Sequence, residues 1–253
     1  MTTAVVTGGN RGIGYAVCQS LVRKGFRTVA VVRDPAAVVP DGVEAVSGDL
    51  SSRRTVAALV ATLRDTCDTI DILVHNAGVW PTRLRHNEDG IEESFAVNHL
   101  APFQLNLALE GQVRRVVQVS AGLYVKGRVD PGRTPQGQDF HRMRTYCDTK
   151  RANLLLMPLF ARRWQDAGVT IDALHPGVIR TDLGDPGGML GALLRLVKRR
   201  WASPAEGAAP IVRLAQASGT GRYFNIDAEE PLPDELVLAR ALWDQARTLT
   251  GAG

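Results

Sequence analysis

The chain has 253 residues, of which 45% are hydrophobic and 22% are charged. These values are typical of a folded globular protein with one sizeable core, and they exclude a disordered or fibrous chain. The 30 basic and 26 acidic residues leave a net charge of only +4. Because the two signs are interspersed, no clustered basic surface for nucleic acid is expected. The strong preference for arginine over lysine suggests a GC-rich bacterial genome.

Three scattered cysteines, at positions 18, 67 and 147, match neither a disulfide framework nor a CxxC metal site. They are typical of a protein from a reducing cytosol. A strand-like run begins at Thr3, which leaves no room for a signal peptide, and no apolar run approaches eighteen residues. We therefore expect a cytoplasmic protein with no membrane partner.

Short apolar runs alternate with amphipathic, helix-length stretches over the first 180 residues. The predicted strands are Ala4–Thr7, Thr28–Val32, Glu44–Val46, Ile70–His75, Arg115–Val119 and Thr170–Leu174. Helices are predicted over Gly14–Lys24 and after a cap at Ser51-Ser52. This rhythm predicts an α/β fold, a doubly wound parallel sheet in a single domain over 1–253, with ligands at the carboxyl ends of the strands.

Two segments interrupt the alternation. Residues 123–145 are rich in Gly, Pro, Arg and Gln, so a long loop is expected before the next helix. Residues 182–201 begin with a Gly- and Pro-rich stretch and then turn apolar. Long loops in compact domains are usually functional or disordered, so we interpret 182–201 as a lid over a site. A plain surface helical hairpin is the alternative.

A glycine-rich turn follows the first predicted strand and opens directly into a helix. Such a turn lets the backbone approach a pyrophosphate, and the helix N-terminus offers it free N–H groups and a positive dipole end. A purely structural turn is the alternative. The predicted phosphate-binding residues are Gly8, Asn10, Arg11, Gly12, Ile13 and Gly14.

The second predicted strand ends at Val32 and is followed by Arg33 and Asp34. A carboxylate at this strand end favours NAD, whereas a cation favours the 2′-phosphate of NADP. We place Arg33 beside the discriminating position and Arg11 as a second phosphate partner, which predicts NADP(H) as the cofactor. Asp34 would favour NAD if the register slipped by two, and a solvated Arg33 is the other alternative.

Tyr146 and Lys150 are four residues apart in a predicted helix that continues through Leu159. Side chains at this spacing share one helix face, where an ammonium group is expected to lower the pKa of a phenol. A tyrosine with such a partner can exchange a proton with a substrate oxygen. On spacing alone, an ordinary exposed pair is the alternative.

Together the turn and the Tyr146/Lys150 pair resemble the short-chain dehydrogenase/reductase family, over nearly the whole chain. Further matches are Asp49-Leu50, Asn76-Ala77-Gly78, Asn98, and Pro176-Gly177 with Thr181. The Asn98-His99-Leu100 run and the long segment before Tyr146 look most like the retinol dehydrogenase and carbonyl reductase branch. The resemblance implies a Rossmann fold and a nicotinamide cofactor.

The resemblance also implies a role for each matching residue. Tyr146 would be the general acid/base, Lys150 would hold the nicotinamide ribose and lower the tyrosine pKa, and Asn98 would position a water in the proton relay. Asp49, Leu50, Asn76, Ala77 and Gly78 would line the adenine side of the cofactor. Pro176, Gly177, Val178 and Thr181 would close around the nicotinamide.

One position departs from the family pattern. The fifth strand normally ends in a serine that binds the substrate oxygen, and here that place holds Ala121, while Ser120 stands one residue earlier. A one-residue step turns a strand side chain to the opposite face, so Ser120 is expected to point away from Tyr146. Losing such a donor typically costs about 10²–10³ in rate. Either the active site or its chemistry is therefore altered.

The five histidines show no ligand spacing, and no metal site is predicted. We expect His175 to pack near the cofactor and His141 to be a solvated loop residue, or alternatively to reach substrate.

The leading functional prediction is an NADPH-dependent oxidoreductase that interconverts a carbonyl and an alcohol on a fairly apolar small molecule. Because Ala121 replaces the serine, an epimerase, dehydratase or cyclase without net redox is one alternative. A cofactor-binding, non-enzymatic protein is the other. We also expect a homodimer.

Overall fold

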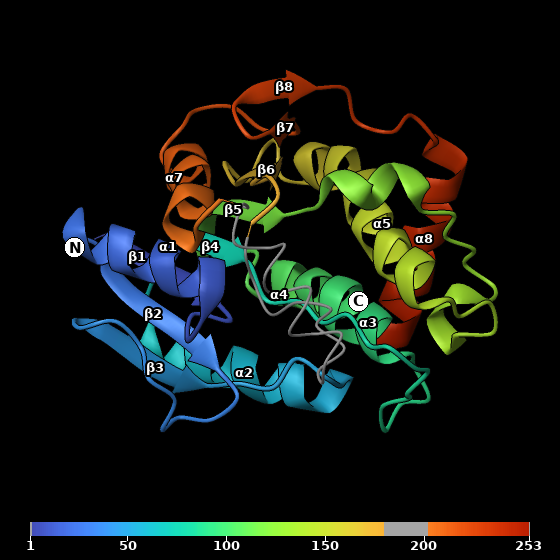
Figure 1. Ribbon diagram of the computed structural model, residues 1–253, viewed down its shortest axis with the longest axis horizontal. Helices are drawn as coiled ribbons and strands as arrows, with labels where there is room; N and C mark the ends of the chain where they lie inside the picture. The colour runs from blue at the N-terminus through green and yellow to red at the C-terminus, as the bar shows by residue number, and fades with distance from the viewer. Residues whose placement is uncertain (1, 180–201, 253) are drawn as a thin grey trace.

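The computed structural model describes residues 2–179 and 202–252. Its centre is an eight-stranded sheet in the order β3-β2-β1-β4-β5-β6-β7-β8 (Figure 1). The pairs are parallel from β3 to β7, and β8 is antiparallel to β7. The strands are β1 Thr3–Thr7, β2 Arg27–Val32, β3 Val43–Ser47, β4 Ile70–His75, β5 Val113–Val119, β6 Thr170–His175, β7 Tyr223–Asn225 and β8 Ala228–Glu230. All six predicted strands are confirmed, with ends that differ by at most two residues.

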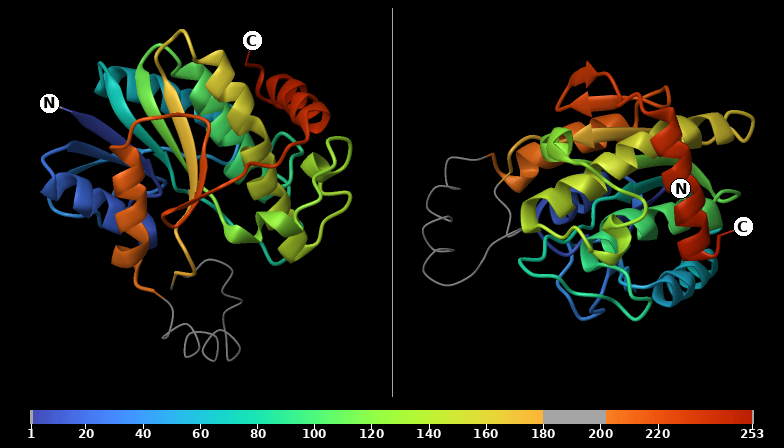
Figure 2. Two further views of the ribbon diagram at one scale, coloured as in Figure 1. Left: turned by 90° about the horizontal axis from the view of Figure 1, so that it is seen from above. Right: turned by 90° about the vertical axis from the view of Figure 1, so that its right-hand side faces the viewer.

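Helices cover both faces of the sheet, as a doubly wound α/β fold requires (Figure 2). The helices α1 and α7 pack on one face, while α2, α4, α5 and α8 pack on the other. The helical segments are α1 Gly12–Arg23, α2 Arg53–Thr66, α3 Glu93–Phe95, η1 Ala96–Leu100, α4 Ala101–Ala108, η2 Gly122–Lys126, η3 Thr134–Gln136, α5 Arg142–Arg163, α7 Pro204–Ala215 and α8 Leu236–Thr250.

Side chains alternate between the two faces along each central strand. In β5, Val116 belongs to the core that α4 and α5 cover, whereas Val117 and Val119 belong to the core under α1 and α7. Both faces of the sheet are therefore buried under helices. A ligand can bind only at the carboxyl ends of the strands. The chain order reverses between β1 and β4, so the fold predicts a ligand crevice there.

The start of α5 departs from the prediction. The helix α5 begins at Arg142, one turn before Tyr146, because the His141 ring accepts a hydrogen bond from the Arg144 N–H (3.3 Å). His141 is thus an exposed cap residue. The expected loop 123–145 contains η2, η3 and the first turn of α5. The predicted lid 182–201 and Thr181 lie outside the described residues.

Candidate active site

The turn after β1 requires glycine at three positions, because of backbone conformation or close contacts. Gly8 and Gly12 have φ of +69° and +56°, which favour glycine. A Cβ on Gly14 would lie 2.2 Å from the Gly8 carbonyl oxygen and 2.4 Å from Nδ2 of Asn76. That amide in turn donates to the carbonyl oxygens of Thr7 (3.0 Å) and Gly8 (3.3 Å). The predicted glycines thus bring the turn, the N-terminus of α1 and the end of β4 together, which fits a dinucleotide pyrophosphate.

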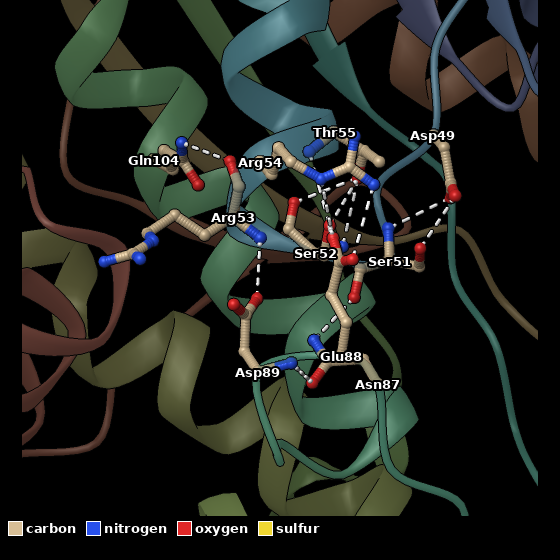
Figure 3. Close-up of polar contacts among 10 residues, drawn as sticks. All are labelled: Asp49, Ser51, Ser52, Arg53, Arg54, Thr55, Asn87, Glu88, Asp89 and Gln104. Carbon is tan, nitrogen blue, oxygen red and sulfur yellow. Dashed lines mark hydrogen bonds and ion pairs between the residues drawn. The ribbon is translucent and has the colours of Figure 1, made fainter.

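The segment after β3 is held by a hydrogen-bond network that the sequence did not suggest (Figure 3). The Asp49 carboxylate accepts hydrogen bonds from the main-chain N–H (3.0 Å) and the hydroxyl (2.7 Å) of Ser51. The Ser51 carbonyl accepts from Nδ2 of Asn87 (2.7 Å), and Ser52, the cap of α2, donates to Glu88 (2.6 Å). The loop after β4 therefore anchors Asp49 and the buried Leu50 at the strand ends.

Two arginines stand at the phosphate end of the crevice. Arg11 precedes α1 and Arg33 follows β2, and both side chains are exposed. Among the described residues, neither guanidinium forms a hydrogen bond or an ion pair. The competing carboxylate is engaged locally, because Asp34 accepts a hydrogen bond from the N–H of Ala36 (2.9 Å).

Tyr146 and Lys150 lie together on the buried side of α5. The Lys150 ammonium is 5.7 Å from the centre of the Tyr146 ring and donates to the Val119 carbonyl (3.0 Å) at the end of β5. Burial lowers the pKa of Lys150 to about 8. Burial, with a smaller contribution from Cys147, raises the pKa of Tyr146. The expected lowering of the tyrosine pKa is therefore wrong, because desolvation of the phenolate dominates and shifts the pKa upward.

Trp80 contacts Tyr146 directly. It was not among the site residues predicted from the sequence. Its indole stacks on the Tyr146 ring with centroids 4.6 Å apart and planes 8° from parallel. Nε1 of Trp80 donates to the carbonyl of Arg142 (2.5 Å) in the first turn of α5. The indole therefore covers one face of the phenol ring, and a ligand can approach the phenol at its edge. Trp80 follows the Asn76–Gly78 motif by two residues, which is the one signal that could have marked it.

Asn98 lies in a π-helical turn between α3 and α4, a type of irregularity often found at functional sites. Its amide donates to the Val79 carbonyl (2.9 Å) and accepts from the Val79 N–H (2.8 Å). It also donates to the hydroxyl of Thr149 (3.2 Å). Its main-chain carbonyl accepts from Asn153 (2.7 Å). Asn98 thus ties the segment after β4 to α5, and its role in a water relay stays a prediction.

Gly78 and the segment after β6 border the Tyr146/Lys150 pair. A Cβ on Gly78 would lie 3.4 Å from Oδ1 of Asn98 and 3.9 Å from Nζ of Lys150. After β6, Pro176 is buried, Gly177 has φ of +94° and Val178 is exposed. Gly78, which was predicted to line the adenine side, therefore lies beside Lys150. The described part of the predicted nicotinamide end, Pro176 to Val178, follows β6, and the ends of β4 and β6 flank β5 in the sheet.

The end of β5 carries Ser120 and Ala121. Continuing the alternation of Val116 and Gln118 places Ser120 on the face that α5 covers, and Ala121 is extended (φ −145°, ψ 140°). The Ser120 hydroxyl is buried and has no hydrogen-bond partner among the described residues. It thus forms no hydrogen bond with Tyr146, so the orientation of Ser120 relative to the tyrosine stays a prediction.

Two features that would indicate other kinds of function are absent from the described residues. Within residues 2–179 and 202–252, no group of three or more His, Cys, Asp or Glu side chains is placed to hold a metal ion. In the same ranges, no helix is both long enough and apolar enough to cross a membrane.

A family model described as short chain dehydrogenase matches residues 2–187. The chain is 34% identical to retinol dehydrogenase 14 of Mus musculus, over 98% of this chain and 86% of that protein. It is 31% identical to "Putative daunorubicin C-13 ketoreductase DnrU" of Streptomyces sp. (strain C5), over 98% and 92%. The chain therefore belongs to the short-chain dehydrogenase/reductase family, in the branch that contains retinol dehydrogenases.

Solved structures show the same fold. A short-chain dehydrogenase from Burkholderia cenocepacia in complex with NADP superposes with a TM-score of 0.71, at 23% identity, covering 89% of this chain and 96% of that one. A 4-hydroxyisoleucine dehydrogenase complexed with NADH gives 0.70 at 22% identity, covering 90% and 97%. The Rossmann-like α/β fold with a parallel sheet is thus confirmed.

Proposed function

We propose that the protein is an NADP(H)-dependent oxidoreductase that interconverts a carbonyl and an alcohol on a fairly apolar small molecule. The observation that carries this proposal is the Tyr146/Lys150 pair, buried on α5 at the carboxyl ends of β4 and β5. A bound nicotinamide supplies the hydride in such a reaction. In the direction of reduction, Tyr146 gives its proton to the substrate oxygen and Lys150 holds a positive charge near the phenol.

The surroundings of the pair favour an apolar substrate. Trp80 covers one face of the phenol, and three large apolar side chains are exposed on the loop after β4, in the first turn of α5 and after β6. They are Leu84, Met143 and Val178, which are 41%, 42% and 59% exposed. These side chains offer an apolar rim to a ligand that reaches the edge of Tyr146.

The most direct test mixes the wild-type protein, NADPH and a panel of apolar ketones and aldehydes. We expect NADPH oxidation that depends on the carbonyl compound. Oxidation equally fast without any carbonyl, or none with the whole panel, would contradict the proposal.

The cofactor preference has its own test. The Arg33 and Arg11 guanidinium groups can each donate charge-assisted hydrogen bonds of about 1.5–3 kcal/mol to a 2′-phosphate. We expect Arg33→Ala to weaken NADPH binding by about tenfold to about a hundredfold and to leave NADH binding nearly unchanged. Titration of both cofactors into both proteins measures this. Equal wild-type affinities, or an unchanged NADPH affinity in the variant, would contradict the assignment of NADP(H).

The raised pKa of Tyr146 predicts opposite pH profiles for the two directions. Reduction needs the protonated phenol, so it stays constant at neutral pH and falls as Lys150, with a pKa of about 8, loses its charge. Alcohol oxidation needs the phenolate, whose fraction rises about tenfold per pH unit below the tyrosine pKa. Initial rates in both directions between about pH 6 and about pH 9 measure this. An oxidation rate that is already at its maximum near neutral pH would contradict it.

Ala121 favours a second candidate, an enzyme of this fold without net redox, such as an epimerase, dehydratase or cyclase. Turnover of a substrate without consumption of cofactor would identify it. Cofactor binding without any turnover would instead favour a non-enzymatic role. A cytoplasmic location and a homodimer also stay predictions.

A further inference from the structure

A histidine lies beside the place of the missing serine. A Cβ built on Gly122 would be 3.0 Å from Cδ2 and 3.2 Å from Nε2 of His175. The Nε2 edge of this imidazole therefore lies over the residue that follows Ala121. A side chain at position 122 would press on the ring, so Gly122 is what admits the imidazole to this position.

The other ring nitrogen faces the protein interior. Nδ1 of His175 and the hydroxyl of Ser120 are both buried, and neither has a hydrogen-bond partner among the described residues. The Ser120 N–H donates to the Leu174 carbonyl (2.7 Å), which extends the ladder after the Val119–Leu174 pair. Ser120 and His175 are therefore neighbours across two parallel strands about 4.8 Å apart, with side chains on the same face. No hydrogen bond joins the two groups in this structure, but a rotation of the Ser120 side chain about χ1 would turn its hydroxyl toward Nδ1. Donation there leaves the imidazole proton on Nε2.

We propose that Nε2–H of His175 donates the hydrogen bond to the substrate oxygen that the family's serine otherwise provides, with Ser120 as the positioning residue that fixes the tautomer. The inference rests on the proposed carbonyl reduction. The hydride of NADPH goes to the carbonyl carbon and the phenolic proton of Tyr146 goes to the oxygen. His175 keeps its proton and only stabilises the oxygen as it gains charge.

Burial and charge agree with this assignment. The His175 side chain is half-buried and can be reached from solvent, whereas the Ser120 hydroxyl is fully buried. Burial lowers the pKa of His175, Lys150 lowers it further, and Glu230 opposes both. The imidazole is therefore neutral at neutral pH, with one N–H to donate.

The first arm of the test measures kcat/KM for NADPH-dependent ketone reduction. We expect His175→Leu to lower it by about 10²–10³, the usual cost of a lost oxyanion donor, while the Kd for NADPH stays within about twofold. His175→Gln, which keeps an N–H donor, should lose less. His86→Leu, at an exposed histidine whose Nε2 bonds only the Gln136 carbonyl, is the matched control and should leave kcat/KM within about twofold.

The second arm reads the tautomer by nitrogen NMR of the His175 ring in the wild-type holoenzyme, so it needs no variant to fold. We expect the proton on Nε2 in wild type and a mixed tautomer in Ser120→Ala, a change that a merely structural serine would not cause. A proton on Nδ1 in wild type would overturn the proposal.

The possible outcomes distinguish the proposed carbonyl reduction from the proposed role of His175. A wild-type protein without carbonyl-dependent NADPH oxidation overturns the proposed function and this inference with it. Clear wild-type activity that His175→Leu retains within about threefold overturns the inference alone. A hundredfold loss in Ser120→Ala beside an active His175→Leu would identify Ser120 as the donor and overturn it as well.

Discussion

Tyr146→Phe is expected to lower the rate of carbonyl reduction by about 10²–10⁴, which is the usual contribution of a general acid. The substitution removes only the hydroxyl. The ring that stacks on Trp80 and lies 5.7 Å from the Lys150 ammonium is kept. We therefore expect the melting temperature and the Kd for NADPH to change little. Steady-state kinetics with one responsive ketone, together with a cofactor titration, measure the two effects separately.

Tyr223→Phe is the matched control for this experiment. Tyr223 is also a buried tyrosine whose pKa burial raises, and its hydroxyl has no partner among the described residues. It lies on β7, where it pairs with Ala173 of β6. We expect nearly full activity from it. If Tyr146→Phe were as active as Tyr223→Phe, Tyr146 would not be the acid.

Gly14→Ala is expected to damage the cofactor site and the fold together. The new Cβ would lie 2.2 Å from a backbone oxygen, at Gly8, so the turn must shift as a whole. Overpacking of this kind costs about 1–3 kcal/mol, which exceeds the roughly 1 kcal/mol that alanine gains over glycine in a helix. The displaced turn should weaken NADPH binding by at least about tenfold, since the pyrophosphate site is built from these backbone groups. Thermal unfolding and cofactor titration measure both.

Gly111→Ala separates a general glycine effect from this specific one. A Cβ at Gly111 would meet no atom within 4 Å, and its φ is not in the left-handed region. Its stability and cofactor affinity should therefore match those of the wild type. Normal NADPH binding by Gly14→Ala would contradict the phosphate role given to the turn.

The sequence predicted the parts of the fold that have a strong local pattern. Six strands have apolar runs long enough to recognise, and the glycine turn is dictated by close backbone contacts that only glycine permits. The strands β7 and β8 were missed because three residues each are too few to show a period. The start of α5 was missed because a histidine caps it, in place of the usual Ser, Thr, Asp or Asn.

The candidate site was predicted in its residues but less well in its geometry. Spacing places Tyr146 and Lys150 on one helix face, yet the balance between burial and charge that sets the tyrosine pKa depends on tertiary packing. The Trp80 stack and the position of His175 over Gly122 join segments far apart in the chain. No local pattern encodes such contacts, whereas the departure at Ala121 could be read directly from the sequence.

The central claim is that this protein moves a hydride between a nicotinamide and a carbonyl carbon. The most direct measurement uses NADPH that carries deuterium at the reactive position of the nicotinamide, an apolar ketone substrate and mass spectrometry of the product. The account predicts one deuterium on the carbinol carbon of the alcohol product, formed by the wild type and almost none by Tyr146→Phe. Substrate conversion without deuterium in the product, or without loss of NADPH, would contradict it and favour chemistry without net redox.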